Sequence, residues 1–171
     1  NYEQYYFELN ISCPNTKEGQ RITENPELLD ELLEKIRHIS DVVCCIKVSP
    51  DQSNDALVQI AKICKKYDKM VLNCGNTQFR TCQSINLAND SISIGGGGLS
   101  GPELFNRTCE MISLLRPYNI PIIATGGVSS EKDVKVLLDL GATLIGLATH
   151  LVKDPFSIPK WNQAISDHYG H

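Results

Sequence analysis

The stretch VVCCIKVSP, residues 42–50, decides the fold class, because six of its first seven residues are apolar. A run without alternation is typical of a strand that is buried on both faces of a sheet. The segments before and after it have helical spacing. The first runs from an N-cap at Asn25, with Pro26 as the first helical residue, to about Ser40, and the second spans about 54–67. A buried strand between two helices predicts a parallel sheet covered by helices.

The same alternation continues in both directions along the chain. Ser130 and Asp133 form a weak capping box for a helix that ends at Gly141, and residues 74–101 have no regular period. Further strands are expected at 5–11, 69–73, 120–125 and 143–148, and further helices at 102–116 and 156–168. Five strands fit a Rossmann-type open sheet or part of a (β/α)8 barrel. The absence of a GxGxxG motif after the first strand disfavours the dinucleotide-binding fold. We expect one α/β domain over residues 1–171.

Composition excludes several classes of protein. The chain has 171 residues, 42% of them hydrophobic, and a formal net charge of −4. This balance is typical of a globular domain, and its acidity argues against binding nucleic acid. No apolar run reaches the roughly 18 residues that a membrane-spanning helix needs. The first residues lack the basic start and apolar core of a signal peptide, so we expect a cytoplasmic protein. The chain starts on Asn rather than Met, so a natural start upstream of Asn1 stays open.

The seven cysteines do not predict a metal centre. There is no CxxC pair, and the spacings match neither a zinc site nor an iron–sulfur signature. Cys44, Cys45, Cys64 and Cys109 lie in apolar segments, so we interpret them as buried thiols of a reducing compartment. Cys13 differs, because it lies in a polar stretch of Asn, Ser and Pro residues directly after a strand.

Polar residues and glycines follow all five expected strands. In parallel α/β folds the carboxyl ends of the strands form the active face. Lys47 lies within an apolar strand, so its ammonium group needs an anion or a carbonyl as partner. Glycines 95–98 fit either a flexible tip or a close approach to a ligand. Gly126–Gly127 and Ala148–Thr149, the latter before a short helix, match a phosphate site of a barrel.

Several of these strings together resemble the dihydroorotate dehydrogenase family. FELNISCPNT (7–16) is similar to its catalytic loop, IKVSP (46–50) to its fifth barrel strand and LNCGNT (72–77) to its sixth. GGGGLSGPEL, IIATGGVSS and LIGLATHLV are similar to its flavin-binding turns. The resemblance covers almost the whole chain in the correct order. It implies the C-terminal part of a (β/α)8 TIM barrel, comprising the fourth to eighth strands.

The resemblance also implies an activity, a cofactor and site residues. The activity is FMN-dependent oxidation of dihydroorotate to orotate, with Cys13 as general base, as in the soluble class. The substrate contacts that it implies are Asn10, Asn15, Asn76 and Thr77. The FMN contacts that it implies are Asn10, Lys47, Gly75, Gly97, Gly98, Thr125, Gly126, Gly127, Ala148 and Thr149. Ala148 departs from the glycine usual in the subclass that uses NAD, but its N–H is retained.

The partners that the resemblance implies are the N-terminal half of the barrel and either a second copy or an electron-transfer subunit. VKDPFSIP (152–159) resembles most the soluble subclass that uses an iron–sulfur/FAD partner and NAD. The electron acceptor stays open between fumarate, NAD through a partner and a quinone. Two alternatives also stay open: a dihydropyrimidine dehydrogenase-like flavin enzyme, and a non-catalytic partial barrel that binds FMN or a partner. No role is predicted for any histidine.

Overall fold

The computed structural model describes residues 5–11, 22, 25–88 and 91–169. The strands are β1 (Tyr6–Asn10), β2 (Val43–Val48), β3 (Met70–Cys74), β4 (Gln78–Thr81), β5 (Gly96–Leu99), β6 (Ile122–Thr125) and β7 (Leu144–Gly146). The α-helices are α2 (Pro26–Ile39), α3 (Asn54–Cys64), α4 (Phe105–Leu115), α5 (Glu131–Leu140), α6 (Thr149–Lys153) and α7 (Ser157–Tyr169). Short 3-10 turns lie at Gln83–Ile85, Pro102–Leu104 and Arg116–Tyr118.

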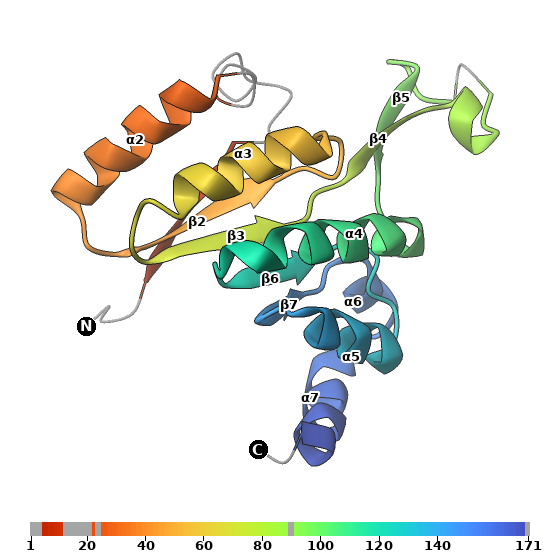
Figure 1. Ribbon diagram of the computed structural model, residues 1–171. Helices are drawn as coiled ribbons and strands as arrows, with labels where there is room; N and C mark the ends of the chain where they lie inside the picture. Colours follow the sequence, from red (N-terminus) through yellow and green to blue (C-terminus); the bar gives the residue numbers. More distant parts are fainter. Residues whose placement is uncertain (1–4, 12–21, 23–24, 89–90, 170–171) are drawn as a thin grey trace.

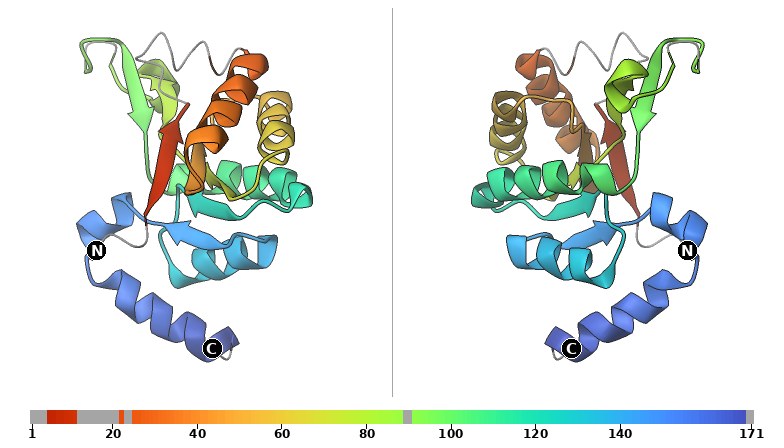
Figure 2. Two further views of the ribbon diagram at one scale, coloured as in Figure 1. Left: turned by 90° about the vertical axis from the view of Figure 1, so that its left-hand side faces the viewer. Right: turned by 90° about the vertical axis from the view of Figure 1, so that its right-hand side faces the viewer.

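Five strands form one parallel sheet in the order β1-β2-β3-β6-β7, as the sequence predicts. Helices α2, α3, α4 and α5 pack side by side in chain order, and together they cover one face of the sheet (Figures 1 and 2). Strand order follows chain order and every connection carries a helix, which is the arrangement within a (β/α)8 barrel. The sheet is not closed, and among the described residues no helical layer covers its other face.

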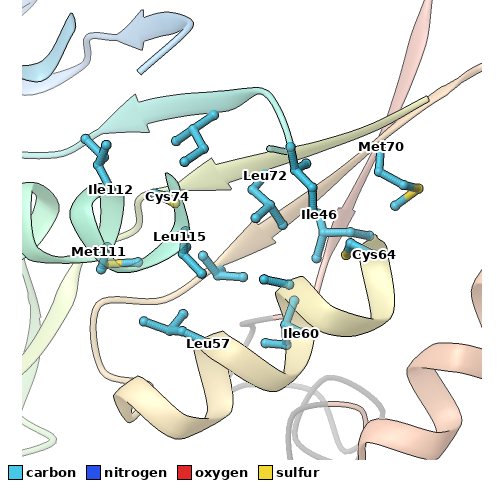
Figure 3. Close-up of a cluster of buried hydrophobic side chains, with 14 of the residues drawn as sticks. Ile46, Leu57, Ile60, Cys64, Met70, Leu72, Cys74, Met111, Ile112 and Leu115 are labelled. Carbon is cyan, nitrogen blue, oxygen red and sulfur yellow. The ribbon is translucent and has the colours of Figure 1, made fainter. Parts of the chain in front are cut away.

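The main core lies between the sheet and these helices. Alternate residues of the strands point to this side, among them Ile46 of β2, Leu72 of β3 and Ile122 of β6, all almost fully buried. They meet Leu57 of α3 and Leu115 of α4, and Figure 3 shows this cluster around Ile46 and Leu72. The strand sequences are continuously apolar because half of their side chains point to the helix-covered face and the other half point to a second face, which is partly apolar.

The expected N-caps at Asn25 and Ser130 are confirmed. The Asn25 side chain accepts a hydrogen bond from the Glu27 N–H at 3.1 Å, and Ser130 Oγ accepts one from the Asp133 N–H at 3.2 Å. The Asp133 carboxylate accepts from the N–H and hydroxyl of Ser129, one residue earlier than a capping box requires. Burial opposes the charged form of Asp133, but these hydrogen bonds outweigh it and lower the pKa of the carboxyl.

The prediction of an irregular segment over residues 74–101 was wrong in part. Strands β4 and β5 form an antiparallel hairpin that extends beyond the carboxyl end of β3 (Figure 1). Strand β5 is Gly-Gly-Gly-Leu, so neither β-branched residues nor alternation announce it. Several boundaries also differ. Helix α3 ends at Cys64 rather than at residue 67, and α4 begins at Phe105 rather than at residue 102. Strand β6 begins at Ile122 rather than at residue 120, and β7 spans only Leu144–Gly146.

The buried-thiol interpretation is confirmed for Cys44, Cys45 and Cys64, while Cys109 is half-buried. All four are free thiols. Burial is the main cause that raises the pKa of Cys45 and of Cys64, each to about 12. Such thiols stay protonated near neutral pH and are poor nucleophiles.

Candidate active site

A cavity of about 250 Å³ lies at the carboxyl ends of β2, β3, β6 and β7. Nine of the predicted site residues line it: Lys47, Gly75, Asn76, Thr77, Thr125, Gly126, Gly127, Ala148 and Thr149. They come from four strands and the segments that follow them, because parallel strands bring their carboxyl ends to one edge. The structure thus brings together most of the site that the sequence proposes.

The register of the sheet sets Lys47 in a row of polar residues. Asn10 of β1 pairs with Lys47 of β2, and Lys47 pairs with Asn73 of β3. Paired residues of neighbouring strands point to the same face, so this row faces away from the helices. Lys47 is half-buried and lines the cavity, and within the described part of the chain it forms no ion pair. Lys47 therefore contributes a positive charge to the lining of the cavity.

Thr125 is held tightly between two glycines. A Cβ atom on Gly75 would lie 2.0 Å from the Thr125 carbonyl oxygen, and one on Gly146 would lie 2.2 Å from Thr125 Oγ1. Both distances are far below van der Waals contact, so neither position accepts a side chain as the structure stands. Glycine at these two positions lets β3 and β7 approach β6 closely, which fixes Thr125 in the wall of the cavity.

Gly127 serves the turn after β6. Its φ is +78°, and an added Cβ would lie 2.2 Å from the Phe105 backbone nitrogen at the start of α4. A side chain is thus disfavoured both by conformation and by space. Gly126 contacts α4 as well, because Thr108 Oγ1 donates a hydrogen bond to its carbonyl at 3.0 Å.

A chain of hydrogen bonds crosses the same face of the sheet. Thr125 Oγ1 donates to Asn73 Oδ1 at 3.0 Å, and Asn73 Nδ2 donates to Glu8 Oε2 at 2.9 Å. The thiol of Cys45 lies 3.8 Å from the same Glu8 oxygen. Three strands, β1, β3 and β6, are linked in this way directly beside the cavity.

The β4–β5 hairpin borders the cavity through Thr77. An added Cβ on Gly98 would lie 2.2 Å from Thr77 Oγ1, so the hairpin packs against that side chain. Asp51, in the loop after β2, accepts a hydrogen bond from the Phe79 N–H of β4 at 2.9 Å. Arg107 of α4 holds that loop by donating to the carbonyl oxygens of Pro50 at 3.1 Å and of Gln52 at 2.8 Å.

Some predicted residues lie elsewhere. Gly97 and Gly98 belong to β5 and do not line the cavity, although Gly98 contacts Thr77, which does. Asn10 lies in the polar row but not in the lining. Cys13 and Asn15 lie outside the described residues, so the catalytic loop stays a prediction.

Sequence reasoning missed several lining residues. His150, for which no role is predicted, lines the cavity and stacks on Trp161 of α7 with ring centroids 4.6 Å apart. The other lining residues without a predicted role are Asn73, Ser100, Gly101, Pro102, Leu104, Val128, Ser129, Gly146, Leu147 and Lys153. The strings around GLSGPEL and LATHLV hold most of them, so proximity to the recognised motifs is the signal that finds them.

A second, apolar hollow lies on the same face of the sheet, towards the amino ends of the strands. Tyr6, Val43, Val71, Ile123 and Leu144 line it, each from a different strand. The face without helices is therefore polar near the carboxyl ends and apolar near the amino ends.

Among the residues that the structure describes, three or more His, Cys, Asp or Glu side chains nowhere gather into a group suited to a metal ion. In the same residues, every helix is too short or too polar to cross a membrane.

A parallel sheet with helices on one face and a polar cavity at its carboxyl edge defines a barrel-type α/β protein with a ligand site. Two solved structures of DHODH from Eimeria tenella share this fold. The one in complex with ferulenol has a TM-score of 0.77 at 21% identity, and the ligand-free one has 0.74 at 20%. They cover 96% and 95% of this chain, which in turn covers 50% of each of theirs. The fold is thus that of part of a TIM barrel.

The sequence comparisons identify the family. The family model described as dihydroorotate dehydrogenase matches residues 2–168. Catalytic subunits of dihydroorotate dehydrogenase B (NAD(+)) from Bacillus mycoides and Bacillus cereus are each 33% identical over 154 residues, which is 89% of this chain. The chain belongs to the dihydroorotate dehydrogenase family. It spans about half the length of the curated relatives it matches, 49% of each of these two. The assignment of this chain to the C-terminal part of the barrel stays a prediction.

Proposed function

We propose that this chain forms part of an FMN-dependent enzyme that oxidises dihydroorotate to orotate in pyrimidine biosynthesis. The observation that carries the proposal is the cavity at the carboxyl edge, where nine predicted site residues from four strands converge in a member of this family. Family membership supplies the substrate class, and the cavity supplies a place for a ligand.

The residues present fit FMN by charge and by shape. Lys47 from β2 and Lys153 from α6 contribute positive charge at the two sides of the lining, which suits an anionic ligand. Leu104, Val128 and Leu147 give the cavity an apolar wall for a flat ring system. Gly127 lines the cavity through its backbone alone, because the Phe105 backbone fills the position of a Cβ atom. Thr149 adds a hydroxyl and Ala148 an N–H near Lys153.

In the proposed reaction this chain's residues bind the substrate and move a proton. Bound FMN supplies an acceptor for the hydride of dihydroorotate. Cys13 takes the ring proton as general base, and its thiol needs a lowered pKa or coupling to hydride loss because a free thiol has a pKa near 8.5. Asn76 and Thr77 hold the planar pyrimidine through amide and hydroxyl hydrogen bonds. Lys47 would stabilise negative charge on the flavin ring.

The proposal also includes partners. The rest of the barrel covers the apolar hollow and completes the site, since eight strands close such a barrel. The curated relatives are described as catalytic subunits of an NAD(+)-using enzyme, which supports an electron-transfer subunit as the route of reoxidation. The departure at Ala148 leaves the N–H that a phosphate needs.

The test uses the protein that carries this chain, with its barrel complete. We expect the purified protein to show a flavin absorption spectrum, and dihydroorotate to bleach it in a single turnover faster than dihydrouracil does. A protein that binds no flavin would refute the proposal, and one reduced only by dihydrouracil would favour the dihydropyrimidine dehydrogenase-like alternative.

Cys13 is tested in the same assay. Cys13→Ala should retain FMN and lose about 10²–10⁴-fold in the rate of flavin reduction, the usual contribution of a general base. Cys13→Ser should keep a weak activity that rises at alkaline pH, and Cys109→Ala is the matched control. Unchanged single-turnover reduction in Cys13→Ala would exclude the base role.

A further inference from the structure

The hydrogen bonds beside the cavity have a defined direction that begins at Glu8. An ionised carboxylate only accepts hydrogen bonds, so the group of Asn73 that faces Glu8 at 2.9 Å must be its NH₂. The carbonyl oxygen of the same amide then faces Thr125. With an acceptor 3.0 Å away, the Thr125 hydroxyl donates its proton to Asn73.

This direction sets what Thr125 offers to a ligand. A hydroxyl has one proton, and here that proton is committed to Asn73, so Thr125 presents oxygen lone pairs to the cavity that it lines. Thr125 cannot readily move to change this, because the backbones of Gly75 and Gly146 confine it on both sides. Without an acceptor at position 8, the Asn73 amide can turn over, and Thr125 then offers a proton instead.

We infer that Glu8 is a positioning residue that acts through Asn73 to make Thr125 a hydrogen-bond acceptor for an O–H or N–H group of the bound ligand. The inference rests on the proposed function, in which the ligand is FMN. FMN carries such donors in the hydroxyls of its ribityl chain and in an N–H of its ring. Glu8 itself lies two residues before Asn10, on the same face of β1, and it does not line the cavity.

The experiment measures FMN affinity of the complete protein, freed of flavin and titrated with FMN by fluorescence quenching. The variants are Glu8→Leu, which removes the acceptor, Thr125→Val, which removes the hydroxyl at constant shape, and the double variant. Two conservative variants accompany them: Glu8→Gln keeps an acceptor oxygen, and Thr125→Ser keeps a hydroxyl. Glu31→Leu on the exposed side of α2 is the control for loss of a carboxylate.

We expect each of the two removals to weaken FMN binding about three- to tenfold, the range for one hydrogen bond. The double variant should bind no more weakly than Thr125→Val alone, because Glu8 acts only through that hydroxyl. Glu8→Gln, Thr125→Ser and Glu31→Leu should stay within about twofold of the unaltered protein.

Several results would overturn the inference. They are wild-type affinity in Thr125→Val, fully additive losses in the double variant, and a loss in Glu8→Gln as large as that in Glu8→Leu. If Glu8→Leu fails to fold by circular dichroism, the comparison of Thr125→Val with Thr125→Ser still decides whether the hydroxyl matters. Failure of the unaltered protein to bind FMN would refute the proposed function, and this inference with it. That outcome is distinguishable from a failure of the inference alone, in which the unaltered protein binds FMN and only the variants depart from the expected affinities.

Discussion

The substitution Gly75→Ala should damage the sheet rather than merely the ligand site. Gly75 directly follows β3, and the sequence resemblance assigns it to FMN binding. In the structure an added Cβ would lie 2.0 Å from the Thr125 carbonyl oxygen, 1.4 Å short of the 3.4 Å at which ordinary contact begins. The obstacle is backbone, so no rotation of a side chain relieves it.

The expected cost follows from where Thr125 lies. Thr125 pairs with Gly146 in the parallel ladder of β6 and β7, so a displacement of this size disrupts hydrogen bonds of the sheet. Overpacking a tight site typically costs about 1–3 kcal/mol. With a urea dependence of about 2 kcal/mol per molar, a loss of 2 kcal/mol lowers the unfolding midpoint by about 1 M.

Urea unfolding of the complete protein, followed by far-UV circular dichroism, measures this loss. The matched control is Gly97→Ala, because an added Cβ there meets nothing within 4 Å and the residue is also a predicted FMN contact. We expect the control to unfold within about 0.5 kcal/mol of the unaltered protein. If Gly75→Ala unfolds at the same midpoint as Gly97→Ala, the close approach of β3 to β6 does not constrain position 75 and the reasoning fails.

Three further predictions concern other parts of the chain. Lys47→Ala should lower the affinity for FMN at least about tenfold, measured by titration, and should lower the reduction potential of the flavin, measured by spectroelectrochemistry. Full FMN retention at an unaltered potential would show that Lys47 has a structural role only. Burial and the hydrogen bond to Asp30 raise the pKa of Tyr67 to about 12, so the protein should lose stability between about pH 10 and 12. Tyr67→Phe should flatten that part of the pH–stability curve, and an unchanged slope would contradict the assignment. The isolated chain of 171 residues should bind 8-anilinonaphthalenesulfonate through its apolar hollow, whereas a protein with a complete barrel should not.

The main strands were predictable because most of them are apolar runs between segments with helical spacing, and their order followed from the family resemblance. Strand 42–48 illustrates this, since burial on both sides of the sheet removes alternation and leaves an unmistakable pattern. The hairpin of β4 and β5 was not predictable, because Gly96–Leu99 pairs through its backbone and has too little side chain to carry a period. Tertiary contact decides such a strand.

Whether a site residue could be predicted depends on whether a local motif or a distant partner determines its role. Motif residues such as Thr125 and Gly127 were found from local strings, and the cavity brings them together. Glu8 was missed because its relevance comes from a partner 65 residues away, Asn73, which no local pattern indicates. The alternation of β1 nevertheless sets Glu8 and Asn10 on one face, so the register of the sheet, once known, recovers it.

The face without helices has two regions with different consequences for the protein. Near the carboxyl ends, Lys47 and Asn73 offer charge and hydrogen bonds at the cavity. Near the amino ends, Tyr6 and Leu144 are 58% and 60% exposed, although large apolar side chains on a sheet face normally meet a second layer. Both regions lie on the same strands, only a few residues apart, so a complete barrel would bury the lower one and enclose the upper one in a single step. Substitutions in the lower region should therefore act on assembly first, and on ligand binding only through it.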